Sequence, residues 1–192
     1  MANVIAPYGL KPVRYLSGAP YNGAFNLYSV AAAYATAIYV GDPVVDIGTG
    51  QTINGSVYKD VQLAATTDVI TGVVIGVLPV TRDSLTYRAA STQRILMVAD
   101  DPNLVFECQE QSTGTPLAAD DIGLNISFNA GTPSTLTGLS GLTLKTDTEA
   151  TTNTLALKIF GFVNRPDNAI GLAANWLVRI NRHRYADQLA GV

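Results

Sequence analysis

A chain of 192 residues suits one domain, or one domain with a long arm, and is long enough to bury a sizeable core. Hydrophobic residues make up 47% and charged residues only 14%, so the surface is short of charge and we expect other subunits to cover much of it. The net charge of −3 argues against a nucleic-acid partner, because neutralising phosphates requires a clustered basic face.

The first segment, residues 1–24, contains prolines and glycines at a spacing that excludes a long helix. We predict an extended N-terminal arm here, because its apolar side chains are too many for a free tail and its backbone groups need partners. Strand addition to a neighbouring subunit would supply those partners. The candidate contact residues of this arm are Val4, Ile5, Pro7, Tyr8, Leu10, Pro12, Val13, Arg14, Tyr15 and Leu16.

The sequence contains no segment expected to enter or cross a membrane. Its N-terminal residues lack the charged and apolar regions of a secretory signal. The longest apolar run, residues 30–40, has 11 residues and is too short for a bilayer. Cys108 is the only cysteine, so no internal disulfide can form and folding in a reducing cytoplasm is expected.

From residue 25 onward, short runs of β-type residues alternate with turn sequences. This pattern predicts an all-β fold, a sandwich or barrel of jelly-roll-like type, in a single β-domain over residues 25–192. The predicted strands are residues 25–30, 35–40, 43–47, 69–78, 84–90, 94–99, 103–109, 124–129, 136–144, 154–163 and 175–181.

Helix is scarce in this pattern. Residues 115–123 could form one short helical turn, with Thr115 as N-cap and Pro116 at the first position. Residues 137–154 are rich in Thr, Ser and Gly and are predicted to form a mobile loop. The glycines of residues 48–55 lack the lysine and the following helix of a phosphate-binding loop, so a turn is predicted there.

Residues 98–111, VADDPNLVFECQEQ, raise the question of whether acids and a cysteine form a catalytic cluster. The Asp-Asp-Pro sequence at 100–102 has the chemistry of a turn, and a paired-carboxylate site would rest on adjacency alone. In the strand that follows, a period of two places Cys108 on the same face as Leu104 and Phe106. We therefore predict a buried, unreactive cysteine.

His183 is the only histidine, and it lies in a basic sequence that predicts a solvated or interface position. A zinc site needs three or four nitrogen or sulfur ligands, and the chain offers two. A nucleophile elbow is also absent from the sequence. Trp176 alternates with Val178 and Ile180, which predicts a core strand. The sequence thus predicts no catalytic residue, no cofactor and no metal.

Four segments of the sequence resemble a family of small virion structural proteins in tailed bacteriophages. They are NVIAPYGLKPVRYLSGAPYN (3–22), YATAIYVGDPV (34–44), ADDPNLVFECQEQ (99–111) with DIGLNISF (121–128), and NWLVRINRHRY (175–185). Some members of that family resemble capsid cement or decoration proteins. The resemblance covers most of the chain in the same order, and the Thr-rich segment is its least similar part.

The resemblance implies a non-enzymatic cement protein on the outer capsid surface of a virion, made in the host cytoplasm. Its expected partners are the major capsid protein and itself, as a homotrimer or a dimer. A tail, neck or head-fibre protein is an alternative of the same all-β kind. A hydrolase or carbohydrate-binding sandwich is an alternative from another class, and exposed aromatic platforms would favour it.

Overall fold

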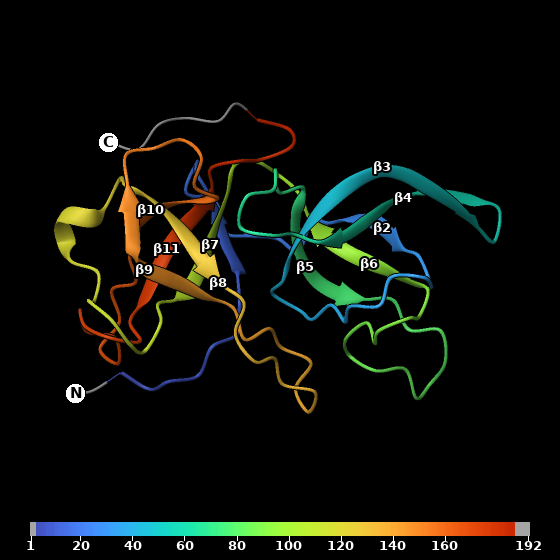
Figure 1. Ribbon diagram of the computed structural model, residues 1–192, viewed down its shortest axis with the longest axis horizontal. Helices are drawn as coiled ribbons and strands as arrows, with labels where there is room; N and C mark the ends of the chain where they lie inside the picture. The colour runs from blue at the N-terminus through green and yellow to red at the C-terminus, as the bar shows by residue number, and fades with distance from the viewer. Residues whose placement is uncertain (1–2, 187–192) are drawn as a thin grey trace.

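The computed structural model describes residues 3–186, and nearly all of their regular structure is β (Figure 1). The all-β prediction is confirmed. The elements are β1 (Lys11–Tyr15), β2 (Asn26–Val30), β3 (Pro43–Ile53), β4 (Ser56–Leu63), β5 (Gly72–Val77), β6 (Arg94–Ala99), β7 (Leu104–Gln109), the 3₁₀ turn η1 (Ala119–Asp121), β8 (Asn125–Asn129), β9 (Thr143–Ala150), β10 (Leu157–Phe162) and β11 (Asn175–Ile180).

Strands β2 to β6 close into a barrel in the order β2-β4-β3-β5-β6. The pairing of β2 with β4 is parallel and the other pairings are antiparallel. Alternation along the strands turns one set of β-branched and aliphatic side chains inward, which is the pattern of a half-buried strand. The barrel core consists of Tyr28, Val30, Ile38, Val44, Val61, Val74, Leu96 and Val98.

The other strands form a six-stranded sheet in the order β1-β7-β11-β10-β8-β9. Its neighbours β1 and β7 are separated in the sequence by the whole barrel, which is therefore an insertion between two adjacent strands of one sheet (Figure 1). The sheet also curls, since Glu110, directly after β7, makes a bridge with Leu144 of β9. The curl encloses a core that includes Phe106, Ile126 and Trp176.

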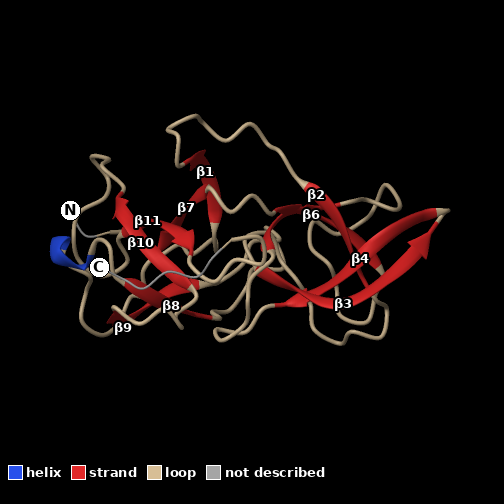
Figure 2. Cartoon of the chain, turned by 90° about the horizontal axis from the view of Figure 1, so that it is seen from above, coloured by secondary structure: helices blue, strands red, loops and turns tan. Residues whose placement is uncertain are grey.

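The barrel and the sheet share that core. Ile70, Val73 and Ala99 come from the barrel and its connections, and they belong to the same buried cluster as Leu104 and Phe106 of the sheet. Figures 1 and 2 show the two units side by side along the long axis of the molecule. They are joined by packed hydrophobic contact, so the two units stabilise one another.

Much of the N-terminal segment packs against its own chain. Leu10 is fully buried, and its backbone N–H donates to the carbonyl oxygen of Gly41. Strand β1 pairs with β7, and Tyr21 returns to donate a hydrogen bond to Val13, so residues 8–21 belong to the sheet of their own chain. Most of the apolar side chains that led us to expect contact with a neighbour are covered, at least in part, by the chain itself.

All six residues of β7 are buried, because both faces of this strand are covered. On one face lies the sheet core. On the other lies the N-terminal strap, as we name residues 3–8, whose backbone exchanges hydrogen bonds with the Gln109 side chain at Val4 and Ala6. The backbone partners that we expected from a neighbouring subunit are therefore supplied, for this part of the strap, by β7.

Strands β3 and β4 form a long hairpin that extends beyond the rest of the barrel (Figure 2). Its two-residue turn, Asn54–Gly55, has φ values of 50° and 82°, which suits the type I′ turn that Asn-Gly favours. The prediction missed β4 and ended β3 at residue 47. Both strands continue through exposed polar residues, where no buried face imposes a period of two on the sequence.

Three further elements differ from the prediction. Residues 143–150 form β9 instead of a loop, and residues 35–40 and 84–90 are joined only by an isolated bridge between Ile38 and Arg88. The helical turn is confirmed over three residues, with Ala118 in place of Thr115 as N-cap.

Gly41 offers a test of the packing between the barrel and the strap. Its φ is +95°, and a Cβ there would overlap the carbonyl oxygen of Tyr8. We expect Gly41→Ala to lower the free energy of unfolding by about 1–3 kcal/mol from backbone strain alone, with the overlap adding to that loss. Chemical denaturation measures the difference.

The matched control is Gly23→Ala, because Gly23 has a φ of +83° and open space around its Cα. This variant should carry the cost of the left-handed backbone without the overlap. Equal losses of stability in the two variants would contradict the close packing of Gly41 on Tyr8.

Candidate functional site

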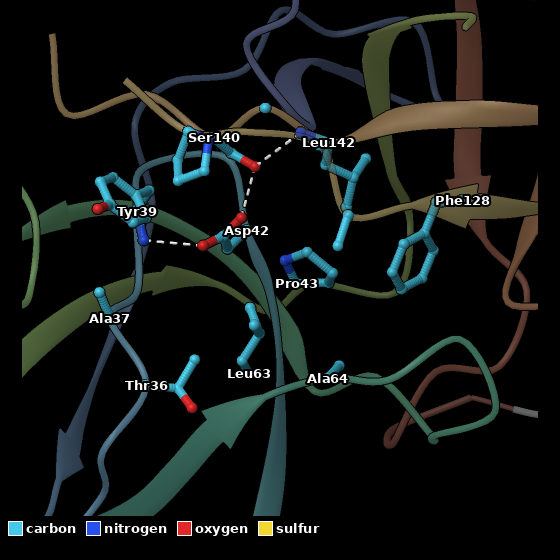
Figure 3. A pocket seen from close by; sticks show the side chains of 14 residues that line it. Thr36, Ala37, Tyr39, Asp42, Pro43, Leu63, Ala64, Phe128, Ser140 and Leu142 are labelled. Carbon is cyan, nitrogen blue, oxygen red and sulfur yellow. Dashed lines mark hydrogen bonds between the residues drawn. The ribbon is translucent and has the colours of Figure 1, made fainter. Parts of the chain in front are cut away.

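The junction between barrel and sheet contains a cavity of about 320 Å³ (Figure 3). Asp42, at the start of β3, is its buried acid. One carboxylate oxygen accepts the backbone N–H of Tyr39 at 2.8 Å, and the other accepts the Ser140 hydroxyl at 2.5 Å. The remaining wall is mostly apolar, with Pro43, Leu63, Ala64, Phe128 and Leu142 around the opening.

The chemistry of this junction is structural. Burial raises the pKa of Asp42 above its usual range, while its two hydrogen bonds oppose that rise. Each carboxylate oxygen accepts one hydrogen bond from the surrounding chain. Its bond to Ser140, together with the backbone bond from Ser140 to Val40, fastens the segment before β9 onto the barrel.

A second cavity of about 600 Å³ lies where the strap meets the barrel. At its polar end, Glu107 accepts hydrogen bonds from the Tyr8 hydroxyl and from Arg165, each at 2.8 Å. Burial and the neighbouring Glu107 raise the pKa of the Tyr8 phenol, so it remains a neutral donor. The Tyr8 oxygen also lies 2.8 Å from Asn175 Oδ1. This network holds the strap on the sheet.

Glu110, one of the acids of the segment 98–111, is buried. Its Oε2 accepts the Trp176 indole N–H at 3.0 Å and the Leu117 backbone N–H at 3.2 Å, whereas Oε1 has no hydrogen-bond partner. Burial raises its pKa to about 7. In the sequence, Glu110 follows a strand that is apolar on one face. That pattern does not reveal whether the other face of the strand is covered, so it could not predict the burial of Glu110.

His183 is buried, which makes the prediction of a solvated or interface histidine wrong. It forms a bridge with Ile70, and its Nδ1 accepts the backbone N–H of Tyr185 at 3.1 Å, while Nε2 is unpaired. Burial lowers its pKa to about 4, against the opposing effect of Asp100 and Asp101. The basic residues on either side of His183 suggested an exposed position. Burial alternates along this segment, however, so His183 is buried while Arg184 is exposed and Arg182 is partly buried.

The predicted turn and core positions of the acid–cysteine segment are confirmed. Asp101 accepts the backbone N–H of Asn103 at 2.7 Å, as expected of a turn acid. Asp100 accepts the Tyr28 hydroxyl at 2.7 Å. Cys108 and Trp176 are fully buried, and burial raises the pKa of the Cys108 thiol. The acids and the cysteine therefore do not converge on one point.

Arg88 is a second buried charge that the sequence did not indicate. Its guanidinium donates to the backbone carbonyl oxygens of Ala31, Tyr34, Thr36 and Thr92, and burial lowers its pKa. Charged hydrogen bonds to four carbonyl groups hold together loops that contain little regular structure. The role of this side chain is to fix one end of the barrel.

The structure divides the ten predicted contact residues into three groups. Leu10 is buried. The next five members of the set are partly covered by their own chain: Pro12, Val13, Arg14, Tyr15 and Leu16. Pro7 and Tyr8 lie half-buried in the strap. Val4 and Ile5 remain 76% and 66% exposed, so they are the members of the set most available to another molecule.

Val4 and Ile5 have apolar neighbours from a distant part of the sequence. Asn3 donates from its side chain to Ala169 and Leu172, and it accepts the Ala169 backbone N–H at 3.0 Å. These bonds hold the strap beside a loop that exposes Ile170 and Leu172. We name Val4, Ile5, Ile170 and Leu172 the strap patch. Ile5 lines the same shallow hollow as Ile170 and Leu172, and Val4 is the exposed residue next to it on the strap.

Over residues 3–186, His, Cys, Asp and Glu side chains do not form a group of three or more that could hold a metal ion. None of the helical structure in that range is long and apolar enough to cross a membrane. Searches against family models, curated proteins and solved structures find no match for this chain.

The pKa shifts of Glu110 and His183 should make the free energy of unfolding depend on pH in opposite directions. The Glu110 pKa rises from 4.5 to about 7 on folding, so its contribution is complete below pH 4.5 and is lost as the pH rises through 7. The His183 pKa falls from 6.5 to about 4, so its contribution is complete above pH 6.5 and is lost as the pH falls through 4. Between pH 4.5 and 6.5 the two effects oppose each other.

Single substitutions should separate the two effects. In Glu110→Gln, the free energy of unfolding should rise more steeply with pH between 4.5 and 6.5 than in the native chain, because the glutamate effect that opposes the histidine effect is removed. In His183→Asn it should fall over the same range. Denaturant titrations at several pH values measure both slopes, and unchanged profiles in both variants would refute the two pKa shifts.

Proposed function

We propose that this protein is a structural component of a tailed-bacteriophage virion, a cement protein that binds the outer head shell and bridges major capsid subunits. The observation that carries the proposal is the strap patch, an exposed apolar surface on a domain whose surface has little charge. Large exposed apolar groups on a rigid support are typical of binding surfaces. The resemblance of four segments to virion structural proteins supports the same function.

The interior supports a mechanical role. Asp42, Glu107 and Arg88 each hold chain segments together through hydrogen bonds, and the strap is fixed at Asn3, Gln109 and Glu107. A cement protein must keep its contact surface in place under load, and a fastened strap loses little conformational freedom when it binds. Its attachment energy then comes from burying apolar side chains.

Two other functions remain as alternatives. A tail, neck or head-fibre protein would use the same kind of surface in fewer copies. A carbohydrate-binding or hydrolase sandwich would need an aromatic platform or an acid pair. Trp176 is buried, and Asp100 and Asp101 are occupied by a tyrosine and a turn. We therefore favour a virion role over a carbohydrate-binding or hydrolase site, and the copy number separates the head from the tail.

The first test counts copies of this protein in purified virions. Quantitative mass spectrometry should find hundreds of copies per particle, and a labelled antibody should decorate the head in electron micrographs. Six to a few dozen copies at the tail or neck would favour the alternative virion role. Absence of the protein from virions would overturn the proposal.

The second test changes the strap patch. We expect Val4→Ser with Ile5→Ser to weaken binding to heads that lack the protein by at least about tenfold, since each buried apolar side chain contributes roughly 1.5–3 kcal/mol. Both positions are exposed, so the melting temperature should change little. A co-sedimentation assay with purified heads gives the affinity.

Val80→Ser is the matched control, because Val80 is 70% exposed in a loop of the barrel and lies outside the strap patch. It should bind heads as the native chain does. Native affinity in the double strap variant would refute the role of the patch.

A further inference from the structure

The outer part of the β3–β4 hairpin is a two-stranded ribbon with no third strand on either side. Strand β3 pairs with β5 only at Pro43 and Val44, and β4 pairs with β2 only at Asp60. Beyond these points β3 and β4 pair only with each other (Figure 2). The paired residues are Gly50–Ile53 of β3 and Ser56–Lys59 of β4, and a register shift leaves residues 47–49 outside the regular ladder. We name residues 47–58 the ribbon. Both edges of the ribbon therefore present unpaired backbone groups.

The ribbon lacks the usual protection of free edges. Natural sheets protect exposed edges with charged residues, proline or a covering segment. Residues 47–58 contain no charged residue and no proline, and Lys59 is the first charge after them. A neutral edge with free donors and acceptors can accept another strand, as in recognition by strand addition.

The base of the ribbon is nevertheless held firmly. Asp60 accepts hydrogen bonds from Thr49 and Gln51, and Gln93 donates to the Gln51 side chain at 2.7 Å. Lys59 pairs with Asp46 at 2.6 Å. These contacts orient the inner face of the ribbon toward the barrel, so the outer face with Thr52 and Val57 is left to solvent, and Val57 is 80% exposed.

The geometry of the turn identifies the backbone groups that point outward. In a hairpin with a two-residue turn, the pair next to the turn is hydrogen-bonded, and the following pair is not. Here Ile53 faces Ser56 next to the turn, and Thr52 faces Val57 as the following pair. The N–H and C=O of Thr52 therefore point away from β4, toward the free edge of β3.

We propose that the β3 edge of the ribbon pairs antiparallel with the same edge of a second copy of this chain, forming an intermolecular four-stranded sheet. Two identical edges related by a two-fold axis perpendicular to the strands are antiparallel, and neutral edges bring no like charges together. The regular β3 edge, Gly50–Ile53, carries no charge, whereas the β4 edge opposite it includes Lys59, which would meet its own copy across the axis. The product is a dimer, the second of the two oligomeric states expected from the sequence.

This pairing does not depend on the proposed virion role, so the isolated chain tests it. Sedimentation velocity should show a dimer at micromolar concentration. Thr52→Pro removes one outward N–H from the β3 edge of each copy and no hydrogen bond inside the ribbon, so it should raise the dissociation constant at least about tenfold.

Val57→Pro is the matched control. It removes an outward N–H from the β4 edge of the same ribbon and should leave the dimer intact. Circular dichroism reports whether both variants fold. If Thr52→Pro is unfolded, Thr52→Lys replaces it, because like charges would then meet across the two-fold axis. A monomeric native chain, or a dimer that survives the Thr52 variant and dissociates with Val57→Pro, would overturn the proposal.

Discussion

The close approach of Gly41 to the N-terminal strap is the constraint on which the rest of this structure depends. At this point the strap, the start of β3 and the segment before β9 come together within hydrogen-bonding distance. The carbonyl oxygen of Gly41 accepts the N–H of Leu10, and the next residue, Asp42, accepts the hydroxyl of Ser140. A side chain at Gly41 would separate these segments, because its Cβ would meet the Tyr8 backbone. The barrel can therefore pack against the sheet only while this position stays small.

The buried charges and the exposed apolar groups lie in different parts of the molecule. Buried charges hold the chain to itself, as Arg88 does for the barrel loops and Glu107 for the strap. Exposed surfaces that could contact other molecules are apolar or neutral, as in the strap patch and the ribbon. A buried charge fixes geometry because leaving it unpaired is costly, whereas an apolar surface gains free energy from any well-fitting partner.

The sequence predicted those parts of the fold where a single buried face controls the residue pattern. The core positions of Cys108 and Trp176 and the all-β class follow from a period of two, which reports burial on one face. The sequence pattern does not predict β4 and β9. Strand β4 lies in an exposed hairpin and β9 is polar on its outer face, so a period of two in apolar residues is absent or weak there. Glu110 and His183 are buried by segments distant in the sequence, and no local pattern encodes such a cover. In the N-terminal segment, β7 of the same chain supplies part of the backbone pairing that the sequence analysis expected from a neighbour, and Val4 and Ile5 stay exposed.

The insertion of the barrel between β1 and β7 has a consequence for how the chain acquires its structure. The barrel strands are close to one another in sequence, so they can associate while later strands are still being synthesised. Strand β1 is made first, yet its partner β7 follows the whole barrel, so β1 must wait for a contact of long sequence separation. Contacts of this kind slow folding, because a large loop has to close before any pairing is gained. During that interval the apolar N-terminal residues are uncovered on the nascent chain, where they are a target for chaperones and for premature association with other copies.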